Sequence, residues 1–256
     1  MFQASSPGFL CQMGSSNASS NSSPSLSRRA QLSEDLASSK QGGLNDEQFQ
    51  KVLQHHGYTE LTRLSPRVFR AQHPSWGLVT IKYAQELKHR HFLKQEAEFL
   101  YSNSDLDTQC ICPKYLDYFS NYQQDFLVLS HISGQTLLET QNESKVTNHS
   151  SCQFISSLET AINQIHRLGF VHGDLKPSNI VMSEQGQAHL IDFGSITKIG
   201  TEREKLHFDS CTPRYSRART ITSKLDDWFA LTVILAELLD EVVMPSRYQV
   251  LLKQHR

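Results

Sequence analysis

A polar segment between two helical patterns constrains this chain more than any other feature. Residues 170–195 read FVHGDLKPSNIVMSEQGQAHLIDFGS. Before the segment, apolar residues recur at steps of three and four over 154–168, which predicts an amphipathic helix that ends at Gly169. After it, residues 225–239 are apolar almost all round and predict a helix buried on most sides. The segment therefore connects two core helices, and residues 180–192 within it read as strand, turn and strand.

Short strand patterns precede this segment. Runs rich in β-branched or aromatic residues are broken by Ser65-Pro66 and by an HPSWG run, which predicts an antiparallel meander of three strands. A helical pattern and two further strand-like runs follow. The expected strands are 59–64, 67–72, 77–84, 112–119 and 125–132, and the expected helix is 86–102. The sequence thus predicts an α+β fold, with a small sheet and one helix before a helical half.

The start of the chain differs from the rest in composition. Residues 1–43 hold 13 serines and few large apolar residues, so they cannot bury enough surface to offset the entropy lost on ordering. We expect residues 1–43 to form a disordered tail and residues 44–256 to form the folded domain. A solvated leader without a specific role and a targeting or secretion segment both fit this composition.

Composition argues against several classes of function. The 25 basic and 26 acidic side chains nearly cancel, and a formal net charge of −1 argues against a mainly electrostatic nucleic-acid binder. The apolar run 228–239 is shorter than the roughly 20 residues of a membrane span. Five cysteines without a CxxC pair suggest neither a zinc site nor a disulfide framework. We expect a cytoplasmic protein with no membrane span, with export as a secreted effector as the alternative.

The motif HGDLKPSN, followed by IDFG, resembles the catalytic loop and the metal-binding segment of eukaryotic-type protein kinases. Phosphoryl transfer requires a carboxylate near the acceptor hydroxyl, oxygen ligands for Mg²⁺ and positive charge near the phosphates. The resemblance implies that Asp174 accepts the proton of the substrate hydroxyl and that Lys176 lies beside the transferred phosphoryl group. It also implies that Asn179 and Asp192 hold Mg²⁺.

The resemblance extends to the predicted sheet and helix upstream. Lys82 in VTIKYA matches the lysine that contacts the α and β phosphates of ATP in this family. Glu96 in FLKQEAEFL is positioned to pair with Lys82. Glu98 is the alternative partner, but it would point to a different face of the helix. We therefore expect the pair to form with Glu96.

The run FLVLSHISGQTL resembles the segment that joins the two lobes of a protein kinase. By this resemblance, Leu129 lies at the back of an adenine pocket. The backbone of Ser130, His131 and Ile132 is expected to bind the adenine edge. The place of this run between the predicted helix and the catalytic loop supports the assignment.

Two motifs downstream complete the resemblance. CTPRYS is similar to the loop that receives a protein substrate in this family. The hydroxyl of Thr212 is expected to bridge Asp174 and Lys176, as in the serine/threonine branch, and an ordinary Thr-Pro turn is the alternative. DDWFAL is similar to the start of the central helix of the large lobe, so we expect Asp226 to bind back to the catalytic loop.

The sequence departs from the kinase pattern at the phosphate loop. Where a glycine-rich motif is expected, the chain reads LTRLSPRV, and only Val68 fits the nucleotide-binding pattern. Pro66 offers no amide hydrogen, and its neighbours carry side chains that keep the backbone away from a phosphate. We expect phosphate binding to be weaker or to depend on Lys82 and metal. Arg63 and Arg67 are candidates for replacing the missing contacts.

Further departures concern regulation and substrate. Gly173 stands where an arginine is usual before the catalytic aspartate, so we do not expect activation by loop phosphorylation. The HGD motif also occurs in aminoglycoside- and choline-type phosphotransferases and in RIO-type kinases, which favours a small-molecule substrate. The DLKPSN, DFG and TPRY motifs favour a protein substrate. No APE motif follows them, and we expect a shortened large lobe.

These motifs together predict a two-lobed protein-kinase-like fold with an antiparallel-sheet N-lobe and a shortened helical C-lobe. The N-lobe is expected at about 44–131 and the C-lobe at about 132–256. ATP and Mg²⁺ are expected between the lobes, with a serine or threonine hydroxyl of a protein as the acceptor. A phosphotransferase acting on an aminoglycoside, sugar or lipid and a catalytically inactive binding module are the alternatives.

Overall fold

The structure, a computed structural model, describes most of the chain beyond residue 45. The described residues are 46–104, 111–121, 124–140, 148–206, 208, 211–218, 220–239 and 244–254. The tail expected at residues 1–43 lies outside them, and the expected domain boundaries stay predictions. All described residues belong to one structural unit that begins at Asp46.

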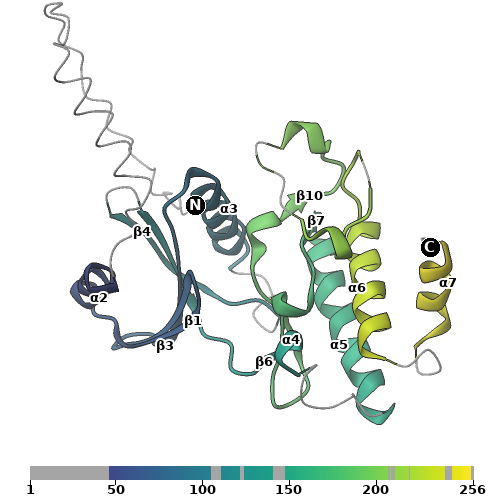
Figure 1. The fold of residues 1–256 in the computed structure, drawn as a ribbon, viewed down its shortest axis with the longest axis horizontal. Helices are drawn as coiled ribbons and strands as arrows, with labels where there is room; N and C mark the ends of the chain where they lie inside the picture. Colours follow the sequence, from purple (N-terminus) through teal and green to yellow (C-terminus); the bar gives the residue numbers. More distant parts are fainter. Residues whose placement is uncertain are drawn as a thin grey trace, which may run out of the picture. The chain divides into compact units, whose positions relative to one another are not determined.

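A five-stranded antiparallel sheet forms the first half of this unit (Figure 1). Its strands are β1 (Thr59–Ser65), β2 (Val68–His73), β3 (Gly77–Ala84), β4 (Tyr115–Asn121) and β5 (Gln124–Ser130). Their order in the sheet is β1-β2-β3-β5-β4, so the three predicted meander strands are continued by two further antiparallel strands. This confirms the predicted antiparallel-sheet lobe.

The two faces of the sheet pack against different helices. α3 (Leu87–Ser102) contacts β3, β4 and β5 and directs Glu96 toward Lys82 of β3. Successive side chains of a strand point to opposite faces, so Ile81 lies on the other face with its cross-strand partner Phe69. α2 (Asp46–His55) covers that second face through Phe49. Helices therefore lie on both faces of the sheet, and Val79 and Ile81 of the central strand β3 are fully buried.

α2 was not expected from the sequence. Its Phe49 ring packs against three rings of the sheet, with centroid distances of 4.4 Å to Phe69, 4.9 Å to Tyr83 and 6.0 Å to Phe126. Leu53 of the same helix is fully buried. Only three of the ten residues DEQFQKVLQH are apolar, so the pattern is too sparse to predict a helix without the sheet that covers it.

The Phe49→Ala variant is expected to lower the free energy of unfolding by about 3–5 kcal/mol, because it leaves a cavity among aromatic rings. Urea denaturation followed by circular dichroism measures this change. Leu87→Ala is the matched control, since the Leu87 side chain is 75% exposed, and it should change the same free energy by less than about 0.5 kcal/mol. Equal effects of the two substitutions would show that α2 contributes no packing energy.

Helices dominate the second half of the described chain (Figure 1). α5 (Asn148–Arg167) and α6 (Lys224–Leu238) are the two predicted core helices, and their buried apolar residues form one core with α3. The predicted strand, turn and strand over 180–192 is present as an antiparallel pair. The remaining short elements are β6 (Gln135–Thr136), α4 (Leu137–Thr140), β7 (Phe170–Val171), η2 (Pro177–Asn179), β8 (Ile180–Met182), β9 (Ala188–Leu190), η3 (Phe193–Ser195), β10 (Thr197–Lys198), η4 (Arg203–Lys205) and η5 (Pro213–Tyr215).

A last helix, α7 (Ser246–Gln254), packs beside α6. Arg247 Nη2 lies 2.5 Å from Glu159 Oε1 of α5, and the Tyr248 hydroxyl donates to the same carboxylate. These contacts attach α7 to the core helices. None of the helices in the described part of the chain is long and apolar enough to span a membrane.

Candidate functional site

The aspartate of the HGDLKPSN motif lies in a network with a lysine and a threonine. Asp174 Oδ1 accepts hydrogen bonds from the backbone N–H and from the hydroxyl of Thr212, both at 2.8 Å. Lys176 Nζ donates to Asp174 Oδ2 at 2.5 Å and to Thr212 Oγ1 at 3.2 Å. Thr212 therefore bridges the two residues, as expected from its motif. A carboxylate, an ammonium group and a hydroxyl converge at one point.

The two predicted metal ligands are close to this network: Asn179 is hydrogen-bonded to the backbone of Asp174, and the charge of Lys176 acts on Asp192. Asn179 Nδ2 donates to the carbonyl of Asp174 at 2.9 Å, which leaves the Asn179 amide oxygen facing away from that carbonyl. The backbone N–H of Ile191 donates to the Asn179 carbonyl at 3.0 Å, so Asp192 follows directly after a point of contact with the catalytic loop. A carboxylate and an amide oxygen are ligands that Mg²⁺ accepts, so the donor set fits this ion.

Lys82 connects the sheet to the DFG segment. Its ammonium group donates to both carboxylate oxygens of Glu96 at 2.8 Å and to Asp192 Oδ1 at 3.0 Å. Burial alone lowers the pKa of Lys82, but Asp192 and Glu96 raise it above its usual value. The charge of Lys82 lowers the pKa of Asp192 in turn. Glu98, the alternative partner, instead lies 3.8 Å from Lys94 on the exposed side of α3.

Phe193 packs the DFG segment against α3. The Phe193 side chain is fully buried, and its ring centroid lies 5.1 Å from that of Phe99 of α3 and 5.1 Å from that of His172. The preceding Asp192 has φ +67° and ψ 68°, a left-handed conformation that is uncommon for a residue with a side chain. Phe193 is thus anchored in the core directly after Asp192, and the Asp192 carboxylate itself is bound by Lys82.

A buried aspartate of α6 fixes the backbone of the catalytic loop. Asp227 Oδ2 accepts the N–H of His172 at 2.9 Å, and Oδ1 accepts the N–H of Gly173 at 3.1 Å. His166 Nε2 of α5 also lies 2.9 Å from Asp227 Oδ2, and both side chains are 2% exposed. Burial alone would raise the pKa of Asp227, but the hydrogen bond with His166 and the charges of the two histidines lower it below its usual value.

This arrangement corrects the expectation for Asp226. The Asp226 side chain does not bind the catalytic loop, but accepts the N–H of Ser223 at 2.6 Å and closes a capping box at the start of α6. Adjacent residues on a helix point about 100° apart, so only one of the two aspartates can face the loop. The sequence therefore predicted the wrong one of the two adjacent aspartates. It gave no role to His166, because the contact of His166 with Asp227 spans 61 positions.

Gly173 occupies a position that a side chain would not fit. Its φ is +82°, a conformation that favours glycine, and a Cβ atom at this residue would lie 2.5 Å from the carbonyl oxygen of Ser195. The contact is with backbone, which cannot move aside as a flexible side chain can. The glycine therefore allows the catalytic loop and the DFG segment to approach each other closely.

Gly173→Ala is expected to destabilise the protein more than Gly200→Ala does. Gly200 has a similar φ of +86°, but a Cβ atom there meets nothing within 4 Å. The Gly200 variant should lose about 1–2 kcal/mol of unfolding free energy through backbone strain alone. The Gly173 variant should lose about 1–3 kcal/mol more through the collision with Ser195. Urea denaturation of the two variants measures the difference, and equal losses would contradict a close approach at Gly173.

The segment predicted to join the two lobes, residues 130–132, begins at the last residue of β5. Leu129 is buried, at 2% exposure. The backbone N–H of His131 donates to the carbonyl of Leu78 at 3.3 Å. The N–H of Ile132 has no backbone acceptor among the residues that the structure describes. Ser130 pairs with Val79 of β3, and its backbone N–H donates to the carbonyl of Lys114 at 2.9 Å.

The turn between β1 and β2 is a tight hairpin without glycine. Ser65 and Val68 are direct cross-strand partners, so Pro66 and Arg67 form the turn. Val68 is also the partner of Lys82 across β2 and β3. Paired residues on neighbouring strands share one face of the sheet, so Val68 lies beside the lysine predicted to contact phosphate.

The two arginines proposed to replace the glycines differ in position. The guanidinium carbon of Arg63 lies 5.1 Å from the ring centroid of Phe69. Phe69 belongs to the face of the sheet that α2 covers. Arg63 is therefore directed to that face, and Arg67 at the tip of the hairpin remains the candidate for a phosphate contact.

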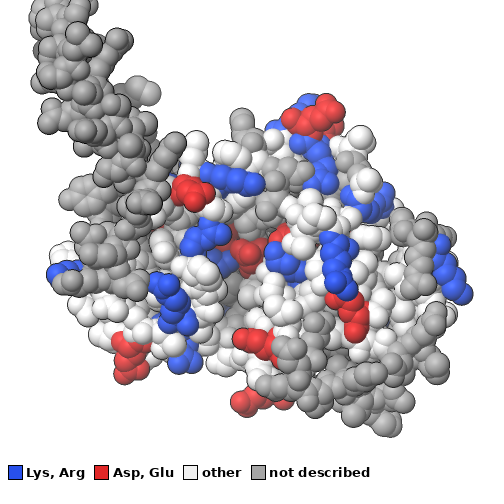
Figure 2. Space-filling view, viewed as in Figure 1, with Lys and Arg blue, Asp and Glu red and all other residues white. Residues whose placement is uncertain are grey.

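Opposite charges gather where these segments meet. Figure 2 shows acidic side chains at the centre of one face of the molecule, with lysine and arginine side chains around them. The ion pairs Lys82–Asp192 and Lys176–Asp174 each place a basic group next to an acidic one. A site of this kind suits a ligand that carries both anionic groups and bound cations.

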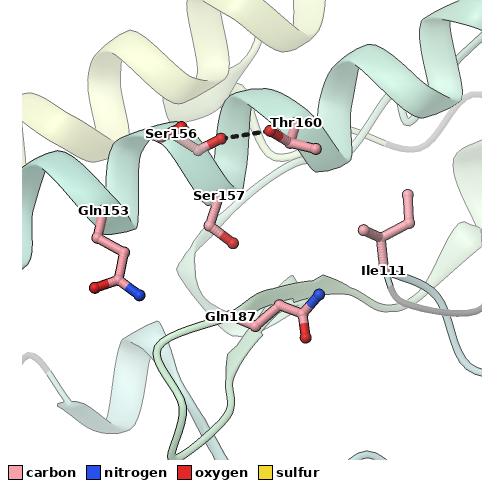
Figure 3. A pocket seen from close by; sticks show the side chains of 6 residues that line it. All are labelled: Ile111, Gln153, Ser156, Ser157, Thr160 and Gln187. Carbon is pink, nitrogen blue, oxygen red and sulfur yellow. Dashed lines mark hydrogen bonds between the residues drawn. The ribbon is translucent and has the colours of Figure 1, made fainter.

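A separate shallow pocket lies on α5 (Figure 3). It has a volume of about 290 Å³ and involves none of the residues named above as candidate ligands or catalytic groups. Its lining carries no ionisable side chain, so it is not suited to phosphoryl transfer. The lining residues are Ile111, Gln153, Ser156, Ser157, Thr160 and Gln187.

Comparison with known proteins identifies the family. The sheet, the Lys82–Glu96 pair and the DFG segment packed on α3 define a protein-kinase-like class of fold. The family model described as the protein kinase domain matches residues 68–252. This match covers more than half of the chain, so the chain belongs to the protein kinase domain family.

Individual relatives match at low identity. A Saccharomyces cerevisiae protein named serine/threonine-protein kinase YPK2/YKR2 is 30% identical over 148 residues, which cover 53% of this chain and 22% of the relative. A Caenorhabditis elegans protein named cAMP-dependent protein kinase, catalytic subunit-like, is 29% identical over 119 residues, covering 44% and 29%. The citron rho-interacting kinase of Rattus norvegicus is 26% identical over 133 residues, covering 47% and 6%. Each match spans less than a third of the relative's length.

Proposed function

We propose that this protein kinase family member transfers the γ-phosphate of ATP to serine or threonine hydroxyls of proteins. The observation that carries the proposal is the position of Lys82 Nζ, which lies 2.8 Å from Glu96 and 3.0 Å from Asp192. An ammonium group held by two carboxylates is already oriented for phosphate oxygens, which reduces the reorganisation needed on binding. A cytoplasmic location and a division into two lobes near residue 131 belong to the same proposal.

In the proposed reaction, the acceptor hydroxyl oxygen forms a bond to the γ-phosphorus. The bond from this phosphorus to the β–γ bridging oxygen breaks, and ADP leaves. The proton of the hydroxyl passes to Asp174, and Lys176 stabilises the charge on the transferred group. The Thr212 hydroxyl lies 2.8 Å from Asp174, which supports a hydroxyl as the acceptor at this carboxylate.

The remaining site residues would hold the nucleotide and the metal. Asn179 and Asp192 are the proposed ligands of Mg²⁺, which when bound neutralises charge on the phosphate oxygens. Leu129 would contact the adenine ring, and the backbone of 130–132 would bind its edge. Val68, directly after the hairpin turn, would lie over the nucleotide, as the resemblance to protein kinases implies.

The direct test is incubation of the purified chain with Mg²⁺, γ-labelled ATP and casein as a generic acceptor. Acid hydrolysis and separation of the phosphoamino acids then identify the labelled residue. We expect label on serine or threonine in the natural protein and none in the Asp192→Ala variant. Absence of any ATP consumption by the natural protein would overturn the proposal.

Two other candidate functions have specific support. The glycine before Asp174 favours a small-molecule phosphotransferase, and ATP consumption that appears only on addition of aminoglycosides, sugars or choline would establish it. The glycine-free hairpin at Pro66 favours an inactive binding module. Binding of nucleotide without turnover of any acceptor would establish that second alternative.

A further inference from the structure

α3 is held by a second ion pair away from Lys82. Arg90 lies near the start of α3, and Asp125 lies at the start of β5. Arg90 Nε donates to Asp125 Oδ2 at 2.8 Å, and Arg90 Nη2 donates to Asp125 Oδ1 at 3.1 Å. Two parallel charge-assisted hydrogen bonds fix both the distance and the orientation of the groups that they join. The pair therefore connects the helix rigidly to the sheet.

The carboxylate of this pair is buried and accepts hydrogen bonds from several side chains. The Asp125 side chain is 8% exposed, and its Oδ1 also accepts the Ser120 hydroxyl at 2.7 Å. Burial alone would raise the pKa of Asp125, but hydrogen bonds from Arg90, Ser120 and Tyr118 lower it below its usual value. Ser120 and Tyr118 belong to β4, so these hydrogen bonds join α3 to two strands.

Three contacts are distributed along α3. The Arg90–Asp125 pair lies near its start, Glu96 pairs with Lys82 in its middle, and Phe99 stacks on the DFG phenylalanine toward its end. Arg90 and Glu96 are six residues apart, which is about 9 Å along a helix axis. A helix of this length is stiff, so a contact at Arg90 restricts the movement of Glu96.

We propose that Arg90 is a positioning residue that holds Glu96 on Lys82, with Asp125 as its fixed anchor. The Lys82–Glu96 pair is then assembled by the folded chain itself, without a ligand. The effect on catalysis rests on the proposed function, whereas the effect on the helix does not. Arg90 acts through α3 and does not touch the reacting groups.

Three variants test this role. Arg90→Ala removes both hydrogen bonds, and Arg90→Lys keeps the charge but loses the fork. Lys94→Ala is the matched control, because Lys94 lies on the same helix and its partner Glu98 is exposed. Each variant is compared with the natural protein well below its unfolding midpoint, so that all samples are folded. The readouts are hydrogen exchange of the α3 amides by mass spectrometry and kcat for phosphoryl transfer.

We expect the α3 amides of the Arg90→Ala variant to exchange about tenfold faster than those of the natural protein. We also expect its kcat to be lower by about tenfold or more. Arg90→Lys should restore part of both losses, and Lys94→Ala should match the natural protein. A lower unfolding midpoint with unchanged α3 exchange and unchanged kcat would overturn the proposal, because it would show a role in stability alone. If the natural protein transfers no phosphate, the proposed function fails, and the exchange measurement still decides whether Arg90 holds α3.

Discussion

Replacement of Asp174 by alanine is expected to lower kcat by about 10²- to 10⁴-fold, the range that a general base contributes. The carboxylate is the proposed acceptor of the hydroxyl proton, and it also fixes Lys176 at 2.5 Å. Without it, the proton has no positioned acceptor and the lysine loses its partner. The KM for ATP should change little, because Lys82 and Asp192 are untouched. Steady-state kinetics with varied ATP and acceptor separate the two parameters.

Glu98→Gln is the control for this experiment. Glu98 is an exposed carboxylate that the sequence offered as an alternative site residue, and in the structure it lies on the outer side of α3. Its removal should leave kcat at the level of the natural protein. A kcat for Asp174→Ala equal to that of Glu98→Gln would contradict the role of Asp174 as proton acceptor.

Asp227→Asn is expected to lower the free energy of unfolding by about 3–5 kcal/mol, the range for breaking a buried charged contact. The side chain keeps its size, but one carboxylate oxygen becomes an NH₂ group. That group cannot accept from the backbone N–H of His172 or Gly173, so at least one buried donor is left unsatisfied. Urea denaturation measures the loss, and the catalytic loop should be the region whose hydrogen exchange rises most.

Asp226→Asn is the matched control, because it changes the neighbouring aspartate in the same way. Asp226 closes the capping box with Ser223, and its Oδ1 lies 3.7 Å from Arg217 Nε at the start of α6, so its replacement should cost about 1 kcal/mol. A larger loss for the Asp226 variant than for the Asp227 variant would contradict the assignment of Asp227 as the anchor of the loop.

The lowered pKa of Asp227 also predicts a dependence of stability on pH. A carboxyl group whose pKa is lower in the folded state stabilises the protein fully above its unfolded pKa, which is about 3.9. This contribution is lost as the pH falls below that value and through the folded pKa. The Asp227→Asn variant should therefore lose less stability than the natural protein between neutral pH and pH about 3. Denaturation curves across this range test the sign, and parallel curves would refute it.

Much of the fold was predictable because its signals are local. The β-branched and aromatic residues of 77–84 predict a strand, and the spacing of apolar residues over 154–168 predicts a helix, since both signals lie in neighbouring positions. The order of the motifs around Lys82 and Asp174 can likewise be read directly from the sequence. Such patterns predicted the sheet, the core helices and the kinase family.

Contacts between distant residues were not predictable in the same way. α2 has too few apolar residues to be recognised, and it is stable because the outer face of the sheet covers Phe49. The choice between Arg63 and Arg67 as the phosphate contact was not predictable either. The position of Arg63 beside the Phe69 ring depends on which face of β1 Arg63 occupies.

The sequence by itself determined the class of the protein and the residue types of its site, because chemistry and periodicity are read from neighbouring positions. Only the tertiary structure decided which of two adjacent aspartates anchors the catalytic loop, and that Arg90 meets Asp125. Both outcomes depend on the rotation of one helix relative to a segment 35 or more positions away. That rotation is set by the packing of the whole core, which no local pattern encodes.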